Sequence, residues 1–505
     1  MSDTQALYDQ LKKRMRDTIT LETVLETLDY DDQTVLPEKG AEYRGEQAAL
    51  IQGLRHERLT DPRVGELLEK LESSSNSWAT DAPERTNIRE WRRDYDRQNK
   101  LARSLVEEVS EAGVTGRSAW IKARSENDFS IFQPSLEKMF DLQKQVAESL
   151  GYDTEPYDAL LDQYEIEAKT SQVAEVFKDL RNELVPMIHT IQQAPRQPDM
   201  SKIEGHFPID RQQEFNRKVA AAIGFDFKRG AMGIAAHPFC CTLGPSDIRI
   251  TTRFEENRFD TAFSSTIHEA GHGLYEQNML TEHWGTPQCY YSSLGIHESQ
   301  SRFWENQVGR TEAFWEKWYP IAQEYFEDLR SVSMEEYLFA MNAANPSLIR
   351  VDADEITYNL HIMIRFEVER AVFNGDLKIE DIPAAWNEKY REYLGVEVPN
   401  DAQGCLQDVH WSIGIMGYFP TYALGNIYAA QFTAAMERDL ESIDTLIEQE
   451  RYPEILGWLR ENVHRHGRHL TPVELVTRAS GEAPTSRHLV DYLKNRYGKL
   501  YGIEL

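Results

Sequence analysis

Apolar residues recur every three or four positions along most of this chain, among many charged residues, which is typical of helices with one buried face. The clearest stretches are 105–111, 136–150, 173–185 and 430–449. One segment, 247–254, begins with alternating polar and apolar residues after a Gly-Pro turn, which predicts a β-strand. The pattern therefore predicts a mainly α fold with a small β-sheet near the middle of the chain.

Turn-forming clusters separate these helices but do not isolate a second domain. They lie at 60–62, 73–83, 193–200 and 398–400, and we find no repeat, low-complexity linker or abrupt change of composition. A chain of 505 residues with 41% hydrophobic content can bury a sizeable core. We therefore expect a single large domain over residues 1–505.

The acidic composition excludes several classes of partner. The formal charge is −29, from 84 acidic and 55 basic residues, so neither a nucleic acid nor an anionic membrane surface is an expected partner. No run of 18 apolar residues predicts a membrane span, and residues 1–16 are charged throughout without the features of a signal peptide. Four cysteines, Cys240 and Cys241 adjacent among them, indicate free thiols in a cytoplasmic protein.

One motif, His268-Glu269-x-x-His272, carries recognisable chemistry. Positions i and i+4 share one face of a helix, so His268 and His272 can bind the same metal ion. Glu269 is rotated by about 100° from His268, which places it beside the metal. A base there can take a proton from water, so the motif predicts a zinc-dependent peptidase.

The residues around this motif favour a helix. We expect Asp260 to cap its start, and Gly271 and Gly273 to leave room for a closely approaching element. The expected apolar face consists of Phe263, Ile267 and Leu274.

A catalytic zinc also needs a third protein ligand and an open position. Glu276 would lie about 12 Å from the first histidine along the same helix, too far to share one ion. His283 does not fit the extended His-x-x-Gly-x-x-His spacing. Glu298 lies 26 residues after the motif, in a second helical stretch that can return alongside the first. The alternative for Glu298 is a surface ion pair with Arg302, one turn further.

Six short motifs follow one another between residues 237 and 411. They are His237-Pro238-Phe239, Asp247-x-Arg249-x-Thr251, His268-Glu269-x-x-His272, His297-Glu298-Ser299-x-Ser301, Ile349-Arg350-x-x-Ala353-Asp354 and Gly404-x-x-Gln407-Asp408-x-His410-Trp411. In these motifs, and more weakly over nearly the whole chain, the sequence resembles the carboxypeptidase Taq family of metallocarboxypeptidases. Tyr30 stands where this family usually has Trp, and Leu36 where it often has Met.

The resemblance implies that Glu298 is the third metal ligand and that the protein removes single residues from the free C-termini of peptides. It implies a neurolysin-like helical fold with a deep groove, flanked by residues of about 1–165, while about 166–505 carry the metal site. It also implies a homodimer. One zinc ion per chain suits a site of two histidines and one carboxylate, although cobalt or manganese can also occupy it.

A carboxypeptidase must hold the free carboxylate of its substrate, and arginine does this best through its two-pronged geometry. Arg350 is the first candidate and Arg249 the second. The alternative for Arg350 is a structural ion pair with Asp352 or Asp354. The strand around Arg249 is expected to run along the groove and bind the substrate backbone, which would give broad specificity.

Donors are also needed for the oxyanion that develops during hydrolysis. His410 and Tyr422 are the candidates, with Tyr418 as a substitute, because related groove peptidases place a His and a Tyr about a dozen residues apart. The aromatic residues of 418–422 could equally belong to the core. His237, which precedes Pro238, has either a structural role or a contact with substrate.

Two other functions are compatible with the motifs. One is an endo-acting oligopeptidase on the same scaffold, which would also cleave peptides with a blocked C-terminus. The other is a peptide-binding protein, metal-stabilised or metal-free, that has lost catalysis. Glu269 argues against this second function, because a purely structural metal site needs no base and usually has four protein ligands.

Overall fold

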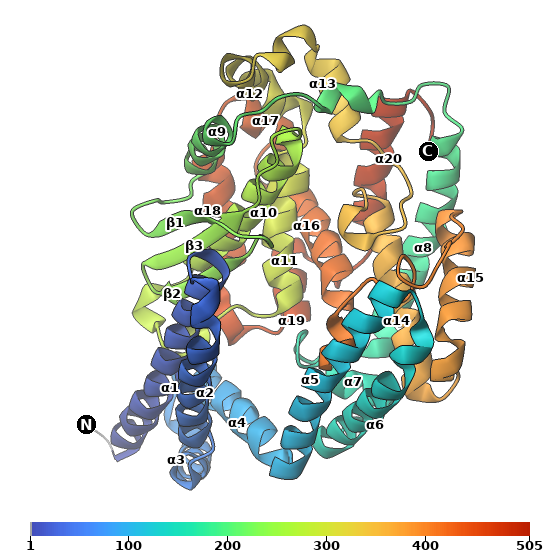
Figure 1. Ribbon diagram of the computed structural model, residues 1–505. Helices are drawn as coiled ribbons and strands as arrows, with labels where there is room; N and C mark the ends of the chain where they lie inside the picture. The colour runs from blue at the N-terminus through green and yellow to red at the C-terminus, as the bar shows by residue number, and fades with distance from the viewer. Residues whose placement is uncertain (1–2) are drawn as a thin grey trace.

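The computed structural model describes residues 3–505 and consists mainly of helices (Figure 1). Met1 and Ser2, at the start of the charged N-terminal stretch, lie outside the described residues. The expected mainly α fold with one small sheet is confirmed. Within residues 3–505, no helix is both long enough and apolar enough to cross a membrane.

The α-helices account for most of the described chain. In chain order they are Asp3–Thr34 (α1), Ala41–Leu59 (α2), Pro62–Ser73 (α3), Pro83–Lys100 (α4), Arg103–Glu126 (α5), Gln133–Leu150 (α6), Pro156–Leu161 (α7), Thr170–Gln192 (α8), Ile209–Ala222 (α9), Phe259–Asn278 (α10), Leu294–Arg302 (α11), Glu312–Tyr325 (α12), Met334–Met341 (α13), Thr357–Asn374 (α14), Ile382–Leu394 (α15), Pro420–Asp439 (α16), Ile443–Glu448 (α17), Tyr452–Asn462 (α18), Pro472–Ser480 (α19) and Arg487–Tyr501 (α20).

The sheet has three strands, β1 (Gly230–Ile234), β2 (Cys240–Gly244) and β3 (Asp247–Thr252). β3 lies in the centre, parallel to β1 and antiparallel to β2. The predicted strand at 247–254 is therefore present but ends two residues earlier. Because β3 has a neighbour on each side, β2 is left as an edge strand.

The helix that bears the histidines packs closely against its neighbours through glycines. A Cβ atom added to Gly271 of α10 would lie 2.6 Å from a backbone carbonyl oxygen of α11, and one added to Gly273 would lie 2.5 Å from the Phe225 ring. On the other side of α11, a Cβ atom on Gly425 of α16 would lie 2.5 Å from Glu298. The expected close approach at Gly271 and Gly273 is confirmed, and α11 is held tightly between α10 and α16.

The start of α10 differs from the expectation. The helix begins at Phe259, Arg258 occupies the capping position, and no side chain caps the helix there. Asp260 lies in the first turn, where its two carboxylate oxygens accept hydrogen bonds of 2.8 and 2.7 Å from Arg258. A carboxylate in the first turn also interacts favourably with the helix dipole. The expectation that Asp260 caps the helix is wrong, because Arg258 occupies both of its oxygens.

The predicted helix at 430–449 is two helices. α16 ends at Asp439, and Leu440 adopts a non-helical conformation with φ −119° and ψ −114°. The side chain of Ser442 then accepts a hydrogen bond from the backbone N–H of Thr445 and caps α17. A serine at this position favours a new helix start, so the apolar periodicity continues across a break.

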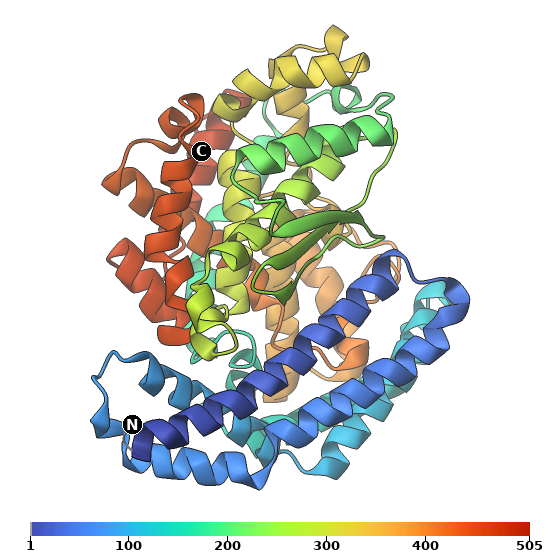
Figure 2. The same ribbon diagram turned by 90° about the vertical axis from the view of Figure 1, so that its left-hand side faces the viewer.

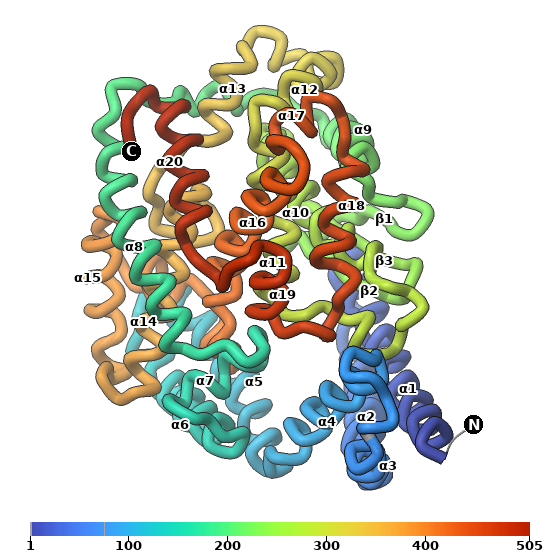
Figure 3. Tube along the Cα trace, turned by 180° about the vertical axis from the view of Figure 1, so that it is seen from behind, coloured from blue at the N-terminus to red at the C-terminus, as the bar shows by residue number. Residues whose placement is uncertain are grey.

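The buried hydrophobic residues form two cores. The larger one extends from Leu105 to Tyr501, and the smaller one, from Tyr8 to Trp91, involves α1, the end of α2, α3 and α4. Figure 2 shows α1 and α2 as two long helices side by side, and α1 also contacts β2. Seen from behind, α20 packs beside α8 in the larger core (Figure 3). The N-terminal helices thus form a separately packed layer next to the sheet.

Candidate metal centre

Two adjacent helices bring together the three residues singled out as metal ligands. His268 and His272 come from α10, and Glu298 comes from α11. The Nε2 atoms of His268 and His272 lie 3.7 and 3.5 Å from Oε2 of Glu298. One ligand atom from each residue lies within 4.8 Å of the other two.

The donor set fits a divalent metal ion. Ligand atoms about 2.1 Å from a tetrahedral zinc lie about 3.4 Å from one another. The observed distances from Glu298 to the imidazoles, 3.5 and 3.7 Å, are close to this value and longer than a good hydrogen bond. Two imidazoles and one carboxylate also match the ligands that zinc, cobalt and manganese accept. The three residues can therefore hold such an ion.

Arg302 binds Glu298, but not at the surface. Its Nε atom donates a hydrogen bond of 2.8 Å to Oε1 of Glu298, and the Glu298 side chain is only 9% exposed. Burial alone would raise the pKa of Glu298, but Arg302 and the two imidazoles outweigh burial and hold this pKa well below its usual range. The alternative pairing of Glu298 with Arg302 is present, but the pair is buried instead of lying at the surface, and it leaves Oε2 facing the histidines.

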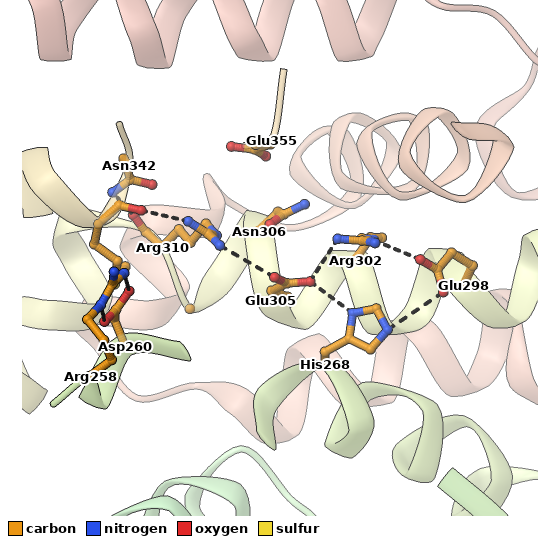
Figure 4. A network of polar contacts seen from close by, with 12 residues as sticks. Arg258, Asp260, His268, Glu298, Arg302, Glu305, Asn306, Arg310, Asn342 and Glu355 are labelled. Carbon is orange, nitrogen blue, oxygen red and sulfur yellow. Dashed lines mark hydrogen bonds and ion pairs between the residues drawn. The ribbon is translucent and has the colours of Figure 1, made fainter. Parts of the chain in front are cut away.

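Glu305 lies behind His268 and was not predicted. Its Oε2 atom lies 2.8 Å from Nδ1 of His268 and 3.1 Å from Arg302, while Oε1 lies 3.5 Å from Arg310 (Figure 4). Burial would raise the pKa of Glu305, but Arg302 and His268 lower it to about 2. Glu298, Arg302 and Glu305 follow one another at four and three residues. This helical spacing is the signal that could have identified Glu305.

The chain turns into a π-helix at this point. Residues Phe303–Val308 (η7) directly follow α11 and carry Glu305. Single π-turns within helices are frequent at functional sites because they reorient side chains locally. The position of Glu305 beside His268 is therefore set by this irregular turn.

His272 has a different neighbour. Its Nδ1 atom lies 2.6 Å from Nδ1 of His297, and Nε2 of His297 lies 2.9 Å from Oε1 of Glu276. Burial, and next the nearby His297, lower the pKa of His272 to about 3. Glu276 lies outside the three-residue cluster, as the distance argument from the sequence required.

Glu269 is buried and open only to the groove. Its residue is 6% exposed, and its carboxylate makes no hydrogen bond to any other residue among 3–505. Burial raises the pKa of Glu269 to about 7. A carboxylate without a protein partner beside the cluster is available to a water molecule or a substrate.

The cluster lies in a groove with a volume of about 580 Å³. Helices α1, α2 and α4 line one side, and α10, the region after it and the start of α16 line the other. Residues of β2 line the groove and residues of β3 do not; both edges of β3 are already paired, with β1 and β2, so its backbone is not free to bind a substrate. The expectation that the strand around Arg249 runs along the groove is therefore wrong, and the edge strand β2 takes that place.

Of the three candidate oxyanion donors, two line the groove and one does not. Tyr418 and Tyr422 line the groove, with ring centroids 5.2 Å apart. His410 is not among the lining residues and packs against Tyr418 and Phe419, with centroids 5.7 and 4.6 Å away. Burial lowers the pKa of His410 to about 4, and its Nδ1 atom has no hydrogen-bond partner among the described residues.

Arg350 is buried next to the groove and pairs with a distant aspartate. Its Nε and Nη2 atoms lie 3.0 and 2.8 Å from Oδ1 of Asp408, and Nη1 donates to the hydroxyl of Tyr358. Arg365 binds the other oxygen of Asp408 at 2.6 Å. The expected alternative pairing with Asp352 or Asp354 is therefore wrong. The fold instead places Asp408, which is 58 residues away in the sequence, in direct contact with Arg350. Two buried guanidinium groups thus share one carboxylate.

The remaining candidates, Arg249 and His237, are not among the residues that line the groove, although Pro238 and Cys241 next to them are. Arg249 makes a two-pronged pair with Asp247 at 2.9 and 2.8 Å, and its guanidinium lies 4.8 Å from the ring centre of Tyr30. His237 is exposed in the bend between β1 and β2. The arginines that do line the groove were not predicted, and they are Arg55, Arg97 and Arg468.

Comparison with known proteins finds relatives that match nearly the whole chain. The chain is 42% identical over 508 residues to thermostable carboxypeptidase 1 of Thermus thermophilus, covering 99% of both chains. It is 37% identical over 473 residues to carboxypeptidase 1 of Bacillus subtilis, covering 94% of both. Among solved structures, it is similar to an M32 carboxypeptidase from Deinococcus radiodurans R1. That match has a TM-score of 0.95 and 39% identity, covering 99% of this chain and 100% of the other.

A second solved structure, a carboxypeptidase of Pyrococcus furiosus, matches with a TM-score of 0.93 and 33% identity over 98% of this chain and 99% of that one. The family model of the carboxypeptidase Taq (M32) metallopeptidases matches residues 10–497. Family, relatives and fold thus agree over nearly the whole length. The chain belongs to the carboxypeptidase Taq (M32) metallopeptidase family.

Proposed function

We propose that this metallocarboxypeptidase uses one zinc ion per chain, held by His268, His272 and Glu298, to release single residues from peptides with broad specificity. Family membership supports a carboxypeptidase that uses a divalent metal. The choice of zinc rests on the donor set and its spacing. Cobalt or manganese can replace it. The observation that carries the proposal is the unpartnered carboxylate of Glu269 beside these three donors.

In this proposal Glu269 is the general base. When bound, the metal ion supplies Lewis-acid chemistry, which polarises a carbonyl group and makes water easier to deprotonate. Glu269 takes a proton from the attacking water and then passes it to the leaving amine. Its burial supports this role. A carboxylate with a pKa raised to about 7 can both accept a proton from water and donate it to the leaving amine near neutral pH.

The developing oxyanion needs hydrogen-bond donors on the groove wall. We assign this role to Tyr422, with Tyr418 beside it, since both hydroxyl-bearing rings line the groove. His410 lies behind Tyr418, and its neutral imidazole can contribute a single N–H. A contact from His410 to the substrate would require it to reach past Tyr418.

We place the substrate carboxylate near Arg350. The guanidinium groups of Arg350 and Arg365 share Asp408 as their ion-pair partner among residues 3–505, so this one carboxylate faces two positive charges. The Arg350 guanidinium lies 5.4 Å from the ring centre of Tyr422, which connects it to the groove wall. Arg249 and His237 remain secondary candidates, and both would have to turn toward the groove.

Broad specificity follows from the edge strand. We propose that the free edge of β2 pairs with the substrate backbone, because an edge strand can add an extended peptide without reading its side chains. We also propose one functional domain over 1–505, in which about 1–165 flank the groove and about 166–505 carry the metal site.

A homodimer and a cytoplasmic location complete the proposal. All four cysteines lie in the described part of the chain and are free, which suits a reducing compartment. Size-exclusion chromatography with light scattering tests the dimer.

The central test is a peptide digestion followed by mass spectrometry, with metal analysis of the same sample. We expect a ladder of products shortened one residue at a time from the C-terminus, and little cleavage of the same peptide with an amidated C-terminus. Internal cleavage of the amidated peptide would instead identify an endopeptidase. Stoichiometric metal without any cleavage would identify a binding protein.

A further inference from the structure

His272 is backed by a chain of two further side chains. His297 lies between His272 and Glu276, with contacts of 2.6 Å from Nδ1 to Nδ1 and 2.9 Å from Nε2 to Oε1. The rings of Tyr275 and Tyr291 lie 5.4 and 5.1 Å from the ring of His297 and restrict its orientation. These contacts hold three polar groups in a row behind the metal centre.

The direction of hydrogen bonding along this row follows from its last member. An ionised carboxylate can only accept, so Nε2 of His297 must donate to Glu276. A neutral His297 then carries a lone pair on Nδ1, and it accepts a hydrogen bond from Nδ1 of His272. His272 is thereby left with a lone pair on Nε2, the atom that lies 3.5 Å from Glu298.

His268 also has its lone pair on Nε2, but it contacts a carboxylate directly, without a second histidine between them. Nδ1 of His268 donates directly to Glu305 at 2.8 Å, so its Nε2 atom also carries the lone pair. Both imidazoles therefore present Nε2 toward Glu298. One is oriented by a carboxylate in direct contact, and the other by a carboxylate that acts through a second histidine.

Glu276 has no other strong partner that explains its position. The side chain is 12% exposed, and His297 is its only ion-pair or hydrogen-bond partner among residues 3–505. A carboxylate this far buried is expected to have a paired or hydrogen-bonded partner. Glu276 also lines the groove, and because no lysine or arginine among residues 3–505 pairs with it, its carboxylate is held by His297 alone.

We propose that Glu276 and His297 are positioning residues that hold His272 in the tautomer able to bind the metal ion. This inference rests on the metal site proposed above. Replacing Glu276 by glutamine keeps the size of the side chain but adds a donor, so His297 is no longer held in one tautomer. Replacing His297 by phenylalanine keeps the ring between the two tyrosines but removes the acceptor for His272.

The test measures zinc affinity by competition with a chelator in Glu276→Gln, His297→Phe and the parent protein. Partners behind a ligating histidine typically contribute about 10- to 100-fold to metal affinity, so we expect a loss of this size in both variants. The matched control is Glu482→Gln, which changes another glutamate–histidine pair, 2.7 Å to His488, at the surface. We expect this control to bind zinc as the parent does.

Two further readouts distinguish the positioning role of Glu276 and His297 from a merely structural one. The relay from Glu276 through His297 to His272 predicts an altered visible spectrum after loading with cobalt in both variants. It also predicts an unchanged melting temperature for metal-free Glu276→Gln, which keeps a hydrogen-bonding group beside His297. A zinc affinity within about threefold of the parent's in either variant would overturn the relay. His272→Ala distinguishes the two levels of the proposal. If this variant binds zinc as tightly as the parent, the assignment of the metal site is wrong, and the role proposed for Glu276 and His297 is wrong as well.

Discussion

Arg302 Nε donates a hydrogen bond of 2.8 Å to Oε1 of Glu298, so that only Oε2 of this buried carboxylate faces His268 and His272. A guanidinium on one oxygen orients the carboxylate and keeps it ionised, as the lowered pKa of Glu298 indicates. The geometry suits a carboxylate that binds a metal ion through a single oxygen. Arg302 also donates a hydrogen bond to Glu305, the carboxylate that contacts His268. One guanidinium group therefore binds both Glu298 and the partner of His268.

The first prediction concerns Glu298. Glu298→Ala should lose zinc on dialysis against a weak chelator, because only two of the three donors remain. The loss should exceed the roughly 100-fold effect of removing a residue that only supports a ligand. Arg302→Lys is the companion variant, and it should weaken zinc binding by about tenfold, since a lysine cannot reproduce the directed N–H. Parent-like zinc content in Glu298→Ala would remove Glu298 from the site.

The second prediction concerns Glu269. Glu269→Gln should keep the fold and the bound metal but lose about 10²- to 10⁴-fold in kcat, because the amide cannot accept a proton. Turnover of a free-acid peptide and zinc content are measured on the same preparation. Activity within about tenfold of the parent's would contradict the assignment of Glu269 as general base.

The third prediction separates substrate recognition by Arg350 from its structural pairing with Asp408. If Arg350 holds the substrate carboxylate, Arg350→Ala should lower kcat/KM for a free-acid peptide by about 30- to several-thousand-fold, equivalent to about 2 to 5 kcal/mol. The amidated form of the same peptide should remain as poor a substrate as before. The measured quantity is therefore the ratio of kcat/KM for the two forms.

Two controls accompany this measurement. Arg350→Lys should recover only part of the preference, since a point charge lacks the two-pronged geometry. Asp408→Asn keeps Arg350 but removes its partner, so it should lower stability and retain a preference for the free acid. If Arg350→Ala is destabilised and its ratio is unchanged, the substrate carboxylate must bind elsewhere, with Arg249 as the next residue to test.

The fourth prediction is a dependence of stability on pH that originates from His464. This residue is fully buried, and burial lowers its pKa from 6.5 to about 3. Above pH 6.5 the imidazole is neutral in both the folded and the unfolded chain, so it adds no pH dependence there. As the pH falls below 6.5 the unfolded chain takes up a proton that the folded protein excludes, and stability is lost down to about pH 3.

At pH 4.5 this loss amounts to about 2.7 kcal/mol, from two pH units at about 1.36 kcal/mol each. His464→Gln can retain a donor toward Oε1 of Gln300, which lies 2.9 Å from Nε2 of His464, but it cannot titrate. We expect the variant to lose less stability than the parent between pH 6.5 and 4.5. Urea unfolding of the metal-free proteins measures this difference, and identical slopes against pH would contradict the assignment.

The features that the sequence alone determined are short-range. The four-residue spacing of His268 and His272 places both on one helix face whatever the rest of the chain does, because the helix has 3.6 residues per turn. The same applies to the helices at 105–111, 136–150 and 173–185, each of which lies within a longer observed helix. The break after Asp439 was missed because apolar periodicity continued across it, although Ser442 signalled a new helix start.

Only the tertiary structure decided which distant side chains meet. Asp408 became the partner of Arg350, and β2, not β3, became the strand along the groove. The row from His272 through His297 to Glu276 depends on how closely α11 approaches α10 at Gly271. Local periodicity states which face of a helix is apolar, but it does not state which other helix covers that face. The partner of a buried charge is therefore decided when the helices pack and water is excluded between them.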